Sequence, residues 1–179
     1  MSDVYRAVCE DVARYCTGKG YREGVGINNF VPHDAVAAFG MARQLVCEIM
    51  FDHYLAVAPE GHIYGYFFER LGCKTTEVYV PYPPVAIRIL EDLSVIKNKR
   101  ILIIEDDIIS GRSLQLVVGE LLRNKPSEIN LFLGHSKGIQ HLDNIPLKIS
   151  RTFIAEDIYA CCDPISLEKE FLRYFLNKP

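Results

Sequence analysis

Apolar residues recur along this chain in two kinds of pattern that alternate with each other. Short continuous apolar blocks predict strands that are buried on both faces. These blocks lie at residues 54–58, 77–80, 101–104, 128–133 and 149–154. Apolar residues at helical spacing predict helices between and around the blocks. These helices are expected at residues 4–18, 34–49, 63–71, 85–96, 114–122 and 164–176.

Residues at the ends of these stretches support the same division. Asp34 is the expected N-cap of its helix, Gly72 follows the end of another, and Asp163-Pro164 should begin the last one. Strands that alternate with helices predict an α/β fold of three layers, with a mostly parallel sheet flanked by helices. In such folds ligands bind beyond the carboxyl ends of the strands.

Length and composition narrow the class of protein. The 179 residues suffice for a single domain, residues 1–179, with a substantial core. Nearly half of the residues are apolar and the formal net charge is −3, which argues against disorder and against a nucleic-acid partner. No apolar run approaches the ~20 residues that cross a membrane, and the N-terminus lacks a signal-peptide pattern. Six cysteines without framework spacing indicate reduced thiols, so we expect a cytoplasmic protein without a membrane partner.

One stretch, residues 101–114, joins a buried strand to a polar turn. Four apolar residues are followed by three carboxylates, and then by a turn with one glycine between two serines. The backbone N–H groups of such a turn and the positive end of the next helix favour a phosphate group. The neighbouring carboxylates suit sugar hydroxyls or a divalent metal. The stretch therefore predicts a phosphate-ester site.

The acidic end of this strand is similar to that of bacterial receiver domains, whose acids hold Mg²⁺ near a phosphoacceptor aspartate. In that family, however, the acidic strand comes first and several β/α units follow it. Here only residues 101–179 remain, and no lone aspartate with a partnering lysine follows at a strand end. Chain order therefore excludes the receiver interpretation.

The stretch resembles far better the signature of type I phosphoribosyltransferases, in which a buried strand ends in two acids and a hydroxyl-rich turn follows. The resemblance implies that Glu105 and Asp106 are the catalytic acids and engage the ribose hydroxyls of phosphoribosyl pyrophosphate (PRPP). It also implies Mg²⁺ as cofactor, bound by Glu105 and Asp106 directly or through water or the ribose hydroxyls. The turn that would cradle the 5-phosphate consists of Ile109, Ser110, Gly111, Arg112 and Ser113.

A second loop of the expected site follows the first predicted strand. Pro59, Glu60, Gly61 and His62 occupy the place of the family's pyrophosphate loop. His62 has an equally good second interpretation as a structural histidine at a helix start. The other histidines show no metal-ligand spacing.

The family also has a small variable hood that binds the acceptor. We expect it in residues 1–33 and 134–163, where no pattern names the acceptor. The expected partners are therefore small molecules, PRPP and an unidentified acceptor, and a homodimer is possible because dimers are common in the family.

Several residues depart from the family pattern. Asp107 stands where an apolar residue is usual, and Glu60 stands where the pyrophosphate loop is often basic. Ile109 replaces the aspartate that assists proton transfer in the hypoxanthine/guanine branch, which argues against that substrate class. A mobile basic loop is often found after the second strand, and here Arg88 is the nearest cation.

Three hypotheses follow from the resemblance and the departures. The first is an Mg²⁺-dependent phosphoribosyltransferase that moves ribose 5-phosphate from PRPP to an acceptor and releases pyrophosphate. The second is a regulatory protein that binds PRPP or a nucleotide without turnover. The third is an enzyme of the reverse direction, a phosphorylase or phosphatase-like relative that acts on a nucleotide.

Overall fold

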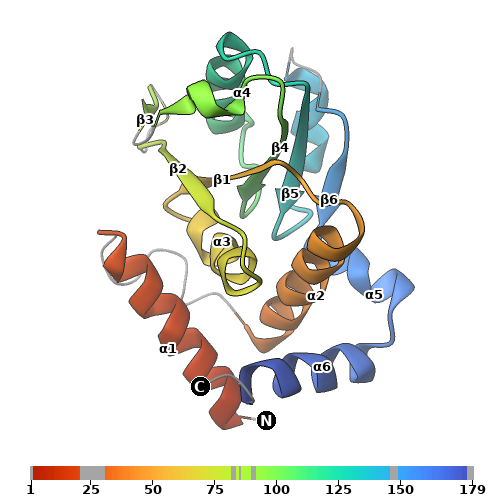
Figure 1. Cartoon of the computed structure of the whole chain (residues 1–179). Helices are drawn as coiled ribbons and strands as arrows, with labels where there is room; N and C mark the ends of the chain where they lie inside the picture. The colour runs from red at the N-terminus through yellow and green to blue at the C-terminus, as the bar shows by residue number, and fades with distance from the viewer. Residues whose placement is uncertain are drawn as a thin grey trace.

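The computed structural model describes residues 2–20, 31–81, 84, 86–89, 92–145 and 149–176. These residues form a six-stranded sheet in the order β3-β2-β1-β4-β5-β6, with helices on both faces (Figure 1). All neighbouring strands are parallel except β2 and β3. The strands are β1 (His53–Ala58), β2 (Thr75–Tyr79), β3 (Arg88–Ile89), β4 (Arg100–Glu105), β5 (Glu128–Leu133) and β6 (Thr152–Ile154). The predicted α/β fold with a mostly parallel sheet is confirmed.

The helices divide between the two faces of this sheet. They are α1 (Ser2–Gly18), α2 (Pro32–Glu48), α3 (Gly61–Arg70), α4 (Arg112–Arg123), α5 (Ile158–Cys161) and α6 (Pro164–Leu176). Short 3₁₀ helices are η2 (Leu93–Ile96), η3 (Ile139–Asn144) and η4 (Ala155–Asp157). One apolar cluster joins α1, α2, α3 and α6 to the sheet, and a second joins α4 and η2 to the opposite face.

Strand β4 shows how both faces of the sheet become buried. Ile101 and Ile103 belong to the cluster on the α4 side, whereas Leu102 and Ile104 belong to the cluster on the other side. Successive side chains of a strand point to opposite faces, and all four of these side chains are fully buried. Each contributes roughly 1.5–3 kcal/mol of hydrophobic free energy. The continuous apolar run therefore fixes β4 in the middle of the sheet.

Two predictions about local structure are wrong. The helix expected over residues 85–96 is absent from its described part, because Arg88 and Ile89 pair antiparallel with β2 and residues 93–96 form η2. Asp34 is not the N-cap of α2, because the helix begins earlier, at Pro32. Asp34 instead lies in the first turn, where its carboxylate accepts a hydrogen bond from the N–H of Val31 (3.2 Å). Most of residues 21–33, part of the expected hood, lies outside the described residues.

Helices α1 and α6 pack on the outside of α2 and α3 (Figure 1). The fully buried ring of Phe171 in α6 joins three helices. It stacks on Tyr5 of α1, with 5.3 Å between ring centroids, and it meets Phe39 of α2 at 5.7 Å. Asp163 accepts a hydrogen bond from the N–H of Ser166 (2.8 Å), which confirms the predicted start of α6. The C-terminal helix is therefore anchored both by a cap and by an aromatic cluster.

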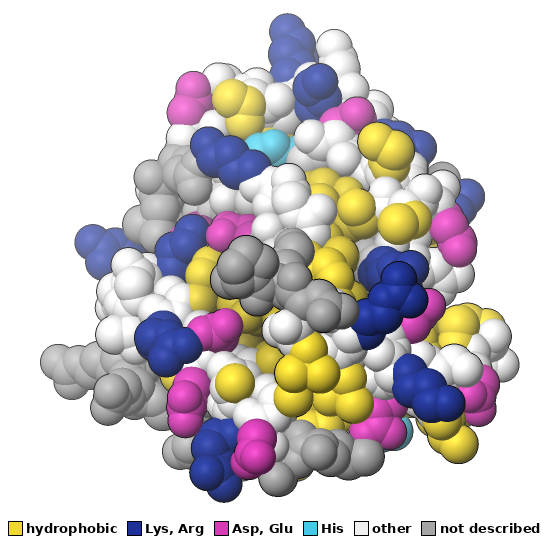
Figure 2. All heavy atoms as spheres, turned by 60° about the horizontal axis from the view of Figure 1, so that its bottom comes forward, with side chains coloured by type: hydrophobic (Ala, Val, Ile, Leu, Met, Phe, Trp, Pro, Cys, Tyr) yellow, Lys and Arg dark blue, Asp and Glu magenta, His cyan; other side chains and the backbone are white. Residues whose placement is uncertain are grey.

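The outer surface of the molecule is mixed in character. Figure 2 shows the face at the bottom of Figure 1, where charged side chains of both signs surround small apolar patches. No helix within the described ranges is both long and apolar enough to cross a membrane. The expected homodimer remains a prediction.

The aromatic cluster around Phe171 makes a testable contribution to stability. Replacing Phe171 with alanine should lower the free energy of unfolding by about 3–5 kcal/mol, because the change leaves a cavity between three helices. The matched control is Leu176→Ala at the exposed end of the same helix, which should change it by less than about 0.5 kcal/mol. Urea unfolding followed by circular dichroism measures both. Equal effects of the two changes would contradict this packing of α6.

Candidate functional site

The candidate site lies where the order of the strands reverses. From β1 the chain builds the sheet outward through β2, and from β4 it builds outward in the other direction through β5. Ligands of such parallel sheets bind beyond the carboxyl ends of the strands at the point where the strand order reverses, and we call this region beyond β1 and β4 the crevice. Ala56 pairs with Ile104, so the two strands end side by side. The loop of residues 59–62 and the turn of residues 105–113 therefore meet at one edge.

The two loops approach each other closely at Gly61, the first residue of α3. A Cβ atom at this position would lie 2.4 Å from the carbonyl oxygen of Ile104 and 3.2 Å from Oε2 of Glu105. No real side chain tolerates the first of these distances, so only glycine allows the loop to rest on the end of β4. The glycine thus positions the expected pyrophosphate loop against the acidic pair.

Four carboxylates gather at this edge, and we call Glu60, Glu105, Asp106 and Asp107 the acidic cluster. Burial raises the pKa of Glu105 well above its ordinary value, and the charges of Asp106 and Glu60 add to the rise. Burial, with the charges of Asp107 and Glu60, raises the pKa of Asp106 to about 6. Burial and the Asp107 charge also raise the pKa of Glu60. These shifts show that the carboxylates lie within one another's electric field.

Few groups offset the charge of the acidic cluster. The ammonium of Lys137 lies 3.2 Å from Oδ2 of Asp107, at the outer side of the cluster. Oε2 of Glu105 is buried and has no hydrogen-bond partner among the residues that the structure describes. A buried acceptor without a donor is costly. The arrangement therefore suits a ligand that brings positive charge or hydrogen-bond donors.

The turn after the acidic cluster leads directly into α4. Gly111 has φ of 74°, a left-handed conformation that glycine adopts without strain, and α4 begins at the next residue. Ile109, Ser110 and Arg112 are exposed, and Ser113 is half-buried. The N–H of Arg112 lies 3.4 Å from Oγ of Ser110, a long and weak hydrogen bond. The turn thus leads into the N-terminus of a twelve-residue helix, where the helix dipole favours a phosphate.

The structure favours one of the two interpretations of His62, which were a contact with pyrophosphate and a structural role. Its side chain is fully buried, and its Nε2 lies 2.9 Å from Oε2 of Glu77 on β2. Lys19, in the turn after α1, lies 2.8 Å from the other oxygen of Glu77. Burial lowers the pKa of His62 although Glu77 favours its charged form. The structural interpretation of His62 thus applies, because the side chain points to the interior and not to the crevice.

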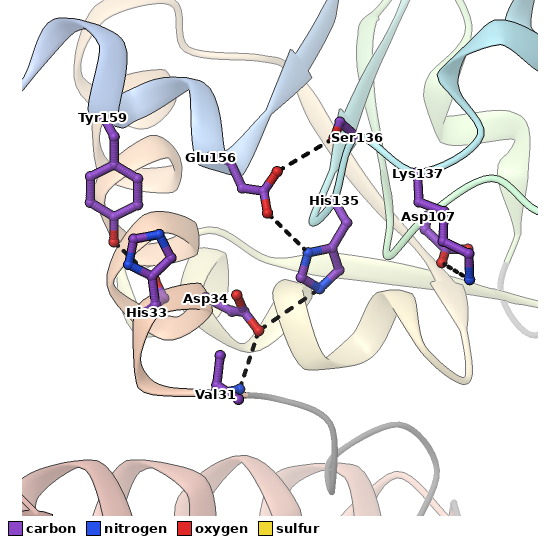
Figure 3. A network of polar contacts seen from close by, with 9 residues as sticks. All are labelled: Val31, His33, Asp34, Asp107, His135, Ser136, Lys137, Glu156 and Tyr159. Carbon is purple, nitrogen blue, oxygen red and sulfur yellow. Dashed lines mark hydrogen bonds and ion pairs between the residues drawn. The ribbon is translucent and has the colours of Figure 1, made fainter.

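A second polar cluster lies beside the acidic one, and no pattern in the sequence predicts it. Asp34, His135 and Glu156, which we call the histidine cluster, come from α2, from the end of β5 and from η4 (Figure 3). The backbone N–H of His135 donates to the carbonyl oxygen of Asp106 (2.8 Å), so the two clusters share a stretch of backbone hydrogen bonds. Glu156 and His135 fall in the segment expected to form the hood.

Tyr64 of α3 connects the two clusters in space. Its ring lies edge-on to the imidazole of His135, with 6.2 Å between centroids. Burial raises the pKa of its hydroxyl, and the charges of Asp106 and Asp34 add to this rise. A Cβ atom at position 134 would lie 2.0 Å from the Tyr64 ring, so Gly134 is required for the ring to pack here.

Comparison with solved structures agrees with this geometry. A purine phosphoribosyltransferase from Pyrococcus horikoshii is 25% identical, with a TM-score of 0.52 over 68% of this chain and 81% of that one. The chain has the fold of type I phosphoribosyltransferases. A hypoxanthine-guanine phosphoribosyltransferase from Bacillus anthracis shares this fold at 16% identity, with a TM-score of 0.51 over 70% of this chain and 79% of that one.

A third similar structure is a hypothetical protein from Neisseria gonorrhoeae with bound ppGpp. It is 15% identical, with a TM-score of 0.50 over 70% of this chain and 80% of that one. No protein-family model and no curated protein matches the sequence.

Within a phosphoribosyltransferase fold, the acidic cluster is the place to test for Mg²⁺. Glu105 and Asp106 offer only oxygen ligands, which is the chemistry that Mg²⁺ requires. The buried Oε2 of Glu105, which has no hydrogen-bond partner among the described residues, is an oxygen that a cation could use. The residues present therefore fit the metal. The expected ligand set of Glu105 and Asp106 remains a prediction.

The close contact at Gly61 can be tested by a single methyl group. Gly61→Ala should lower the free energy of unfolding by about 1–3 kcal/mol, because the backbone at Ile104 must move. The control is Gly119→Ala in the interior of α4, where a Cβ atom would meet nothing within 4 Å. This control should gain about 0.5–1 kcal/mol from the better helix former. Urea unfolding compares the two, and a neutral Gly61→Ala would contradict the contact.

The raised pKa of Asp106 predicts a pH-dependent effect on stability. A carboxyl whose pKa is higher in the folded protein stabilises the fold while it is protonated, and this contribution is lost as pH rises from about 4 to about 6. In chelator-treated protein, Asp106→Asn should therefore gain about 1–2 kcal/mol at pH 7.5, after allowance for solvent screening. The gain should shrink as pH falls toward 5.

Thermal unfolding at several pH values measures this effect of Asp106→Asn. The control is Asp3→Asn, the same change of side chain at an exposed position of α1. A constant difference between wild type and Asp106→Asn would show that the carboxylate repulsion is absent.

Proposed function

We propose that the protein is an Mg²⁺-dependent phosphoribosyltransferase, which moves ribose 5-phosphate from PRPP to an acceptor and releases pyrophosphate. One observation carries the proposal. The acid pair Glu105-Asp106, the glycine turn at the start of α4 and the loop after β1 converge at one point of the sheet. A phosphorylated sugar with a pyrophosphate leaving group needs all three parts.

The turn of residues 109–113 would bind the 5-phosphate. Its backbone N–H groups, the hydroxyls of Ser110 and Ser113, and the helix dipole of α4 all favour an anion there. The left-handed Gly111 lets the chain pass tightly from the acidic cluster into the helix. Binding at this turn would place the sugar next to Glu105 and Asp106.

Glu105 and Asp106 would hold the ribose by accepting hydrogen bonds from its hydroxyl groups. Mg²⁺ bound at these acids would offset negative charge on the leaving pyrophosphate. By resemblance to the family, the sugar becomes positively charged as the bond to pyrophosphate breaks. The negative field of the acidic cluster stabilises such a charge, so positioning and electrostatics suffice without a covalent protein nucleophile.

Ile109 argues against one class of acceptor but does not identify the acceptor. Two of the similar structures are named as purine or hypoxanthine-guanine phosphoribosyltransferases. Here an exposed isoleucine stands where the hypoxanthine/guanine branch has its aspartate. A carboxylate that assists proton transfer is thus missing from this position. We therefore propose a nucleophile other than a 6-oxopurine.

Binding without turnover is a second candidate function, and Glu60 favours it. This carboxylate lies in the expected pyrophosphate loop, and its raised pKa reflects burial beside Asp107. Negative charge at this position opposes the charge that a leaving pyrophosphate develops. The similar structure with bound ppGpp holds a nucleotide in this fold. A PRPP or nucleotide sensor would need the phosphate turn but no basic loop.

Calorimetric titration with PRPP in the presence of Mg²⁺ tests the shared part of both candidates. Wild-type protein should bind PRPP, and Asp106→Asn should bind it about tenfold more weakly or worse, because one charge-assisted contact is worth roughly 1.5–3 kcal/mol. Asp3→Asn serves as the control and should bind like wild type. Equal affinity of Asp106→Asn and wild type would remove the proposed role of that acid.

Pyrophosphate release separates the two candidates. The protein is incubated with Mg-PRPP and a panel of nucleobases and other nitrogen nucleophiles, and released pyrophosphate is measured. Release that depends on one acceptor and is lost in Asp106→Asn supports the transferase. Saturable binding of PRPP without release under any acceptor favours the sensor.

A further inference from the structure

The histidine cluster brings together one imidazole and two carboxylates from three separate segments. In Figure 3 the His135 ring lies between Asp34 on one side and Glu156 on the other. Nε2 of His135 is 3.9 Å from Oδ2 of Asp34, and Nδ1 is 3.5 Å from Oε1 of Glu156. One ligand atom from each residue can be chosen so that all three lie within 4.8 Å of one another.

These distances are informative because they are too long for strong direct bonds. A charge-assisted hydrogen bond spans about 2.7–2.9 Å. Ligand atoms around a tetrahedral ion with bonds of about 2.0–2.1 Å stand roughly 3.4 Å apart. Asp34 lies at Nε2 of His135 and Glu156 lies at Nδ1, and one ion can bind only one of these nitrogens. One carboxylate must therefore turn toward the other nitrogen, and the side chain of Glu156, which is 41% exposed, has room to do so. The ligand atoms of the three residues already lie within 4.8 Å of one another.

From this arrangement we propose that Asp34, His135 and Glu156 form a binding site for a divalent transition-metal ion of the zinc and cobalt class. The site is separate from Glu105 and Asp106, and the proposal does not depend on phosphoribosyl transfer. An imidazole nitrogen selects such ions over Mg²⁺ and Ca²⁺, which prefer sets made of oxygen alone. Two carboxylates and one imidazole also leave a fourth position for water or another ligand.

The surrounding structure holds the three ligands in place. The Asp34 carboxylate is nearly buried and is oriented by the N–H of Val31 in the first turn of α2. His135 is fixed through its backbone bond to Asp106 and through the Tyr64 ring beside its imidazole. The hydroxyl of Ser136 lies 3.5 Å from the second oxygen of Glu156. Such supporting contacts orient metal ligands in known sites.

Solvent can reach the proposed site, as metal entry requires. His135 and Glu156 are partly exposed, whereas Asp34 forms the inner wall. A bound ion would join the start of α2, the end of β5 and the η4 turn. Because the backbone N–H of His135 donates to the carbonyl oxygen of Asp106, a bound ion would also affect the position of the acidic cluster.

Titration of chelator-treated protein with Co²⁺ tests the site, because visible absorption reports both affinity and ligand type. With excess Mg²⁺ present to occupy the all-oxygen acidic cluster, we expect saturation at one Co²⁺ per chain and no thiolate charge-transfer band. His135→Gln and Glu156→Gln should each weaken binding about tenfold or more, since the loss of a ligand costs at least as much as the loss of a supporting contact. The thermal midpoint of the wild type, and not of these variants, should rise with Co²⁺.

Two controls make the result decisive. His141→Gln removes another histidine near the crevice edge, and Asp106→Asn removes a member of the acidic cluster; both should keep Co²⁺ affinity. Absence of saturable binding, or full affinity in His135→Gln, would overturn the proposal. Loss of binding in Asp106→Asn would place the ion at the acidic cluster instead. A thiolate band would place it on cysteines, and either result would also overturn the proposal.

Discussion

The site depends on one close contact, in which the backbone at Gly61 rests on the carbonyl oxygen of Ile104. The parallel pairing of β1 and β4 brings two strand ends together, but pairing alone does not decide how near their loops can come. The absence of a side chain at residue 61 decides how near the loops come. It allows the loop after β1 to lie against Glu105, so that two segments far apart in the sequence line the same crevice. Most of the acidic cluster and the phosphate turn lie at this place because they come directly after β4 in the chain.

The same contact makes the crevice electrostatically unfavourable without a ligand. Burial, together with the mutual repulsion of the carboxylates, raises the pKa values of Glu60, Glu105 and Asp106. Ionisation of these carboxylates therefore lowers the free energy of unfolding at neutral pH, and a ligand that offsets their charge raises it again. Groups with shifted pKa values are common at functional sites. The neighbouring histidine cluster differs, because its two acids already face an imidazole.

Much of this structure could be predicted because its signals are local. The apolar run of β4, the carboxylates that follow and the glycine before α4 are consecutive, so one short stretch specified strand, turn and helix. The prediction of a helix over residues 85–96 was wrong because their apolar spacing suits a helix, whereas Ile89 pairs with Val78 and extends the sheet. The buried side chain of His62 contacts Glu77 on strand β2, and this contact could not be predicted from the residues around His62 alone. The histidine cluster was missed because only the folded chain brings its members together, and no spacing rule covers three distant segments.

The contacts of Glu77 connect the N-terminal helix to the loop beside the acidic cluster. Lys19 at the end of α1 holds Glu77, and Glu77 holds His62 in the first turn of α3, directly after Gly61. The loop beside the acidic cluster is therefore supported from outside the sheet, by Lys19 through Glu77 and through a histidine whose pKa burial lowers. A shortened protein that begins at α2 would retain every strand but lose Lys19, and with it one support of that loop.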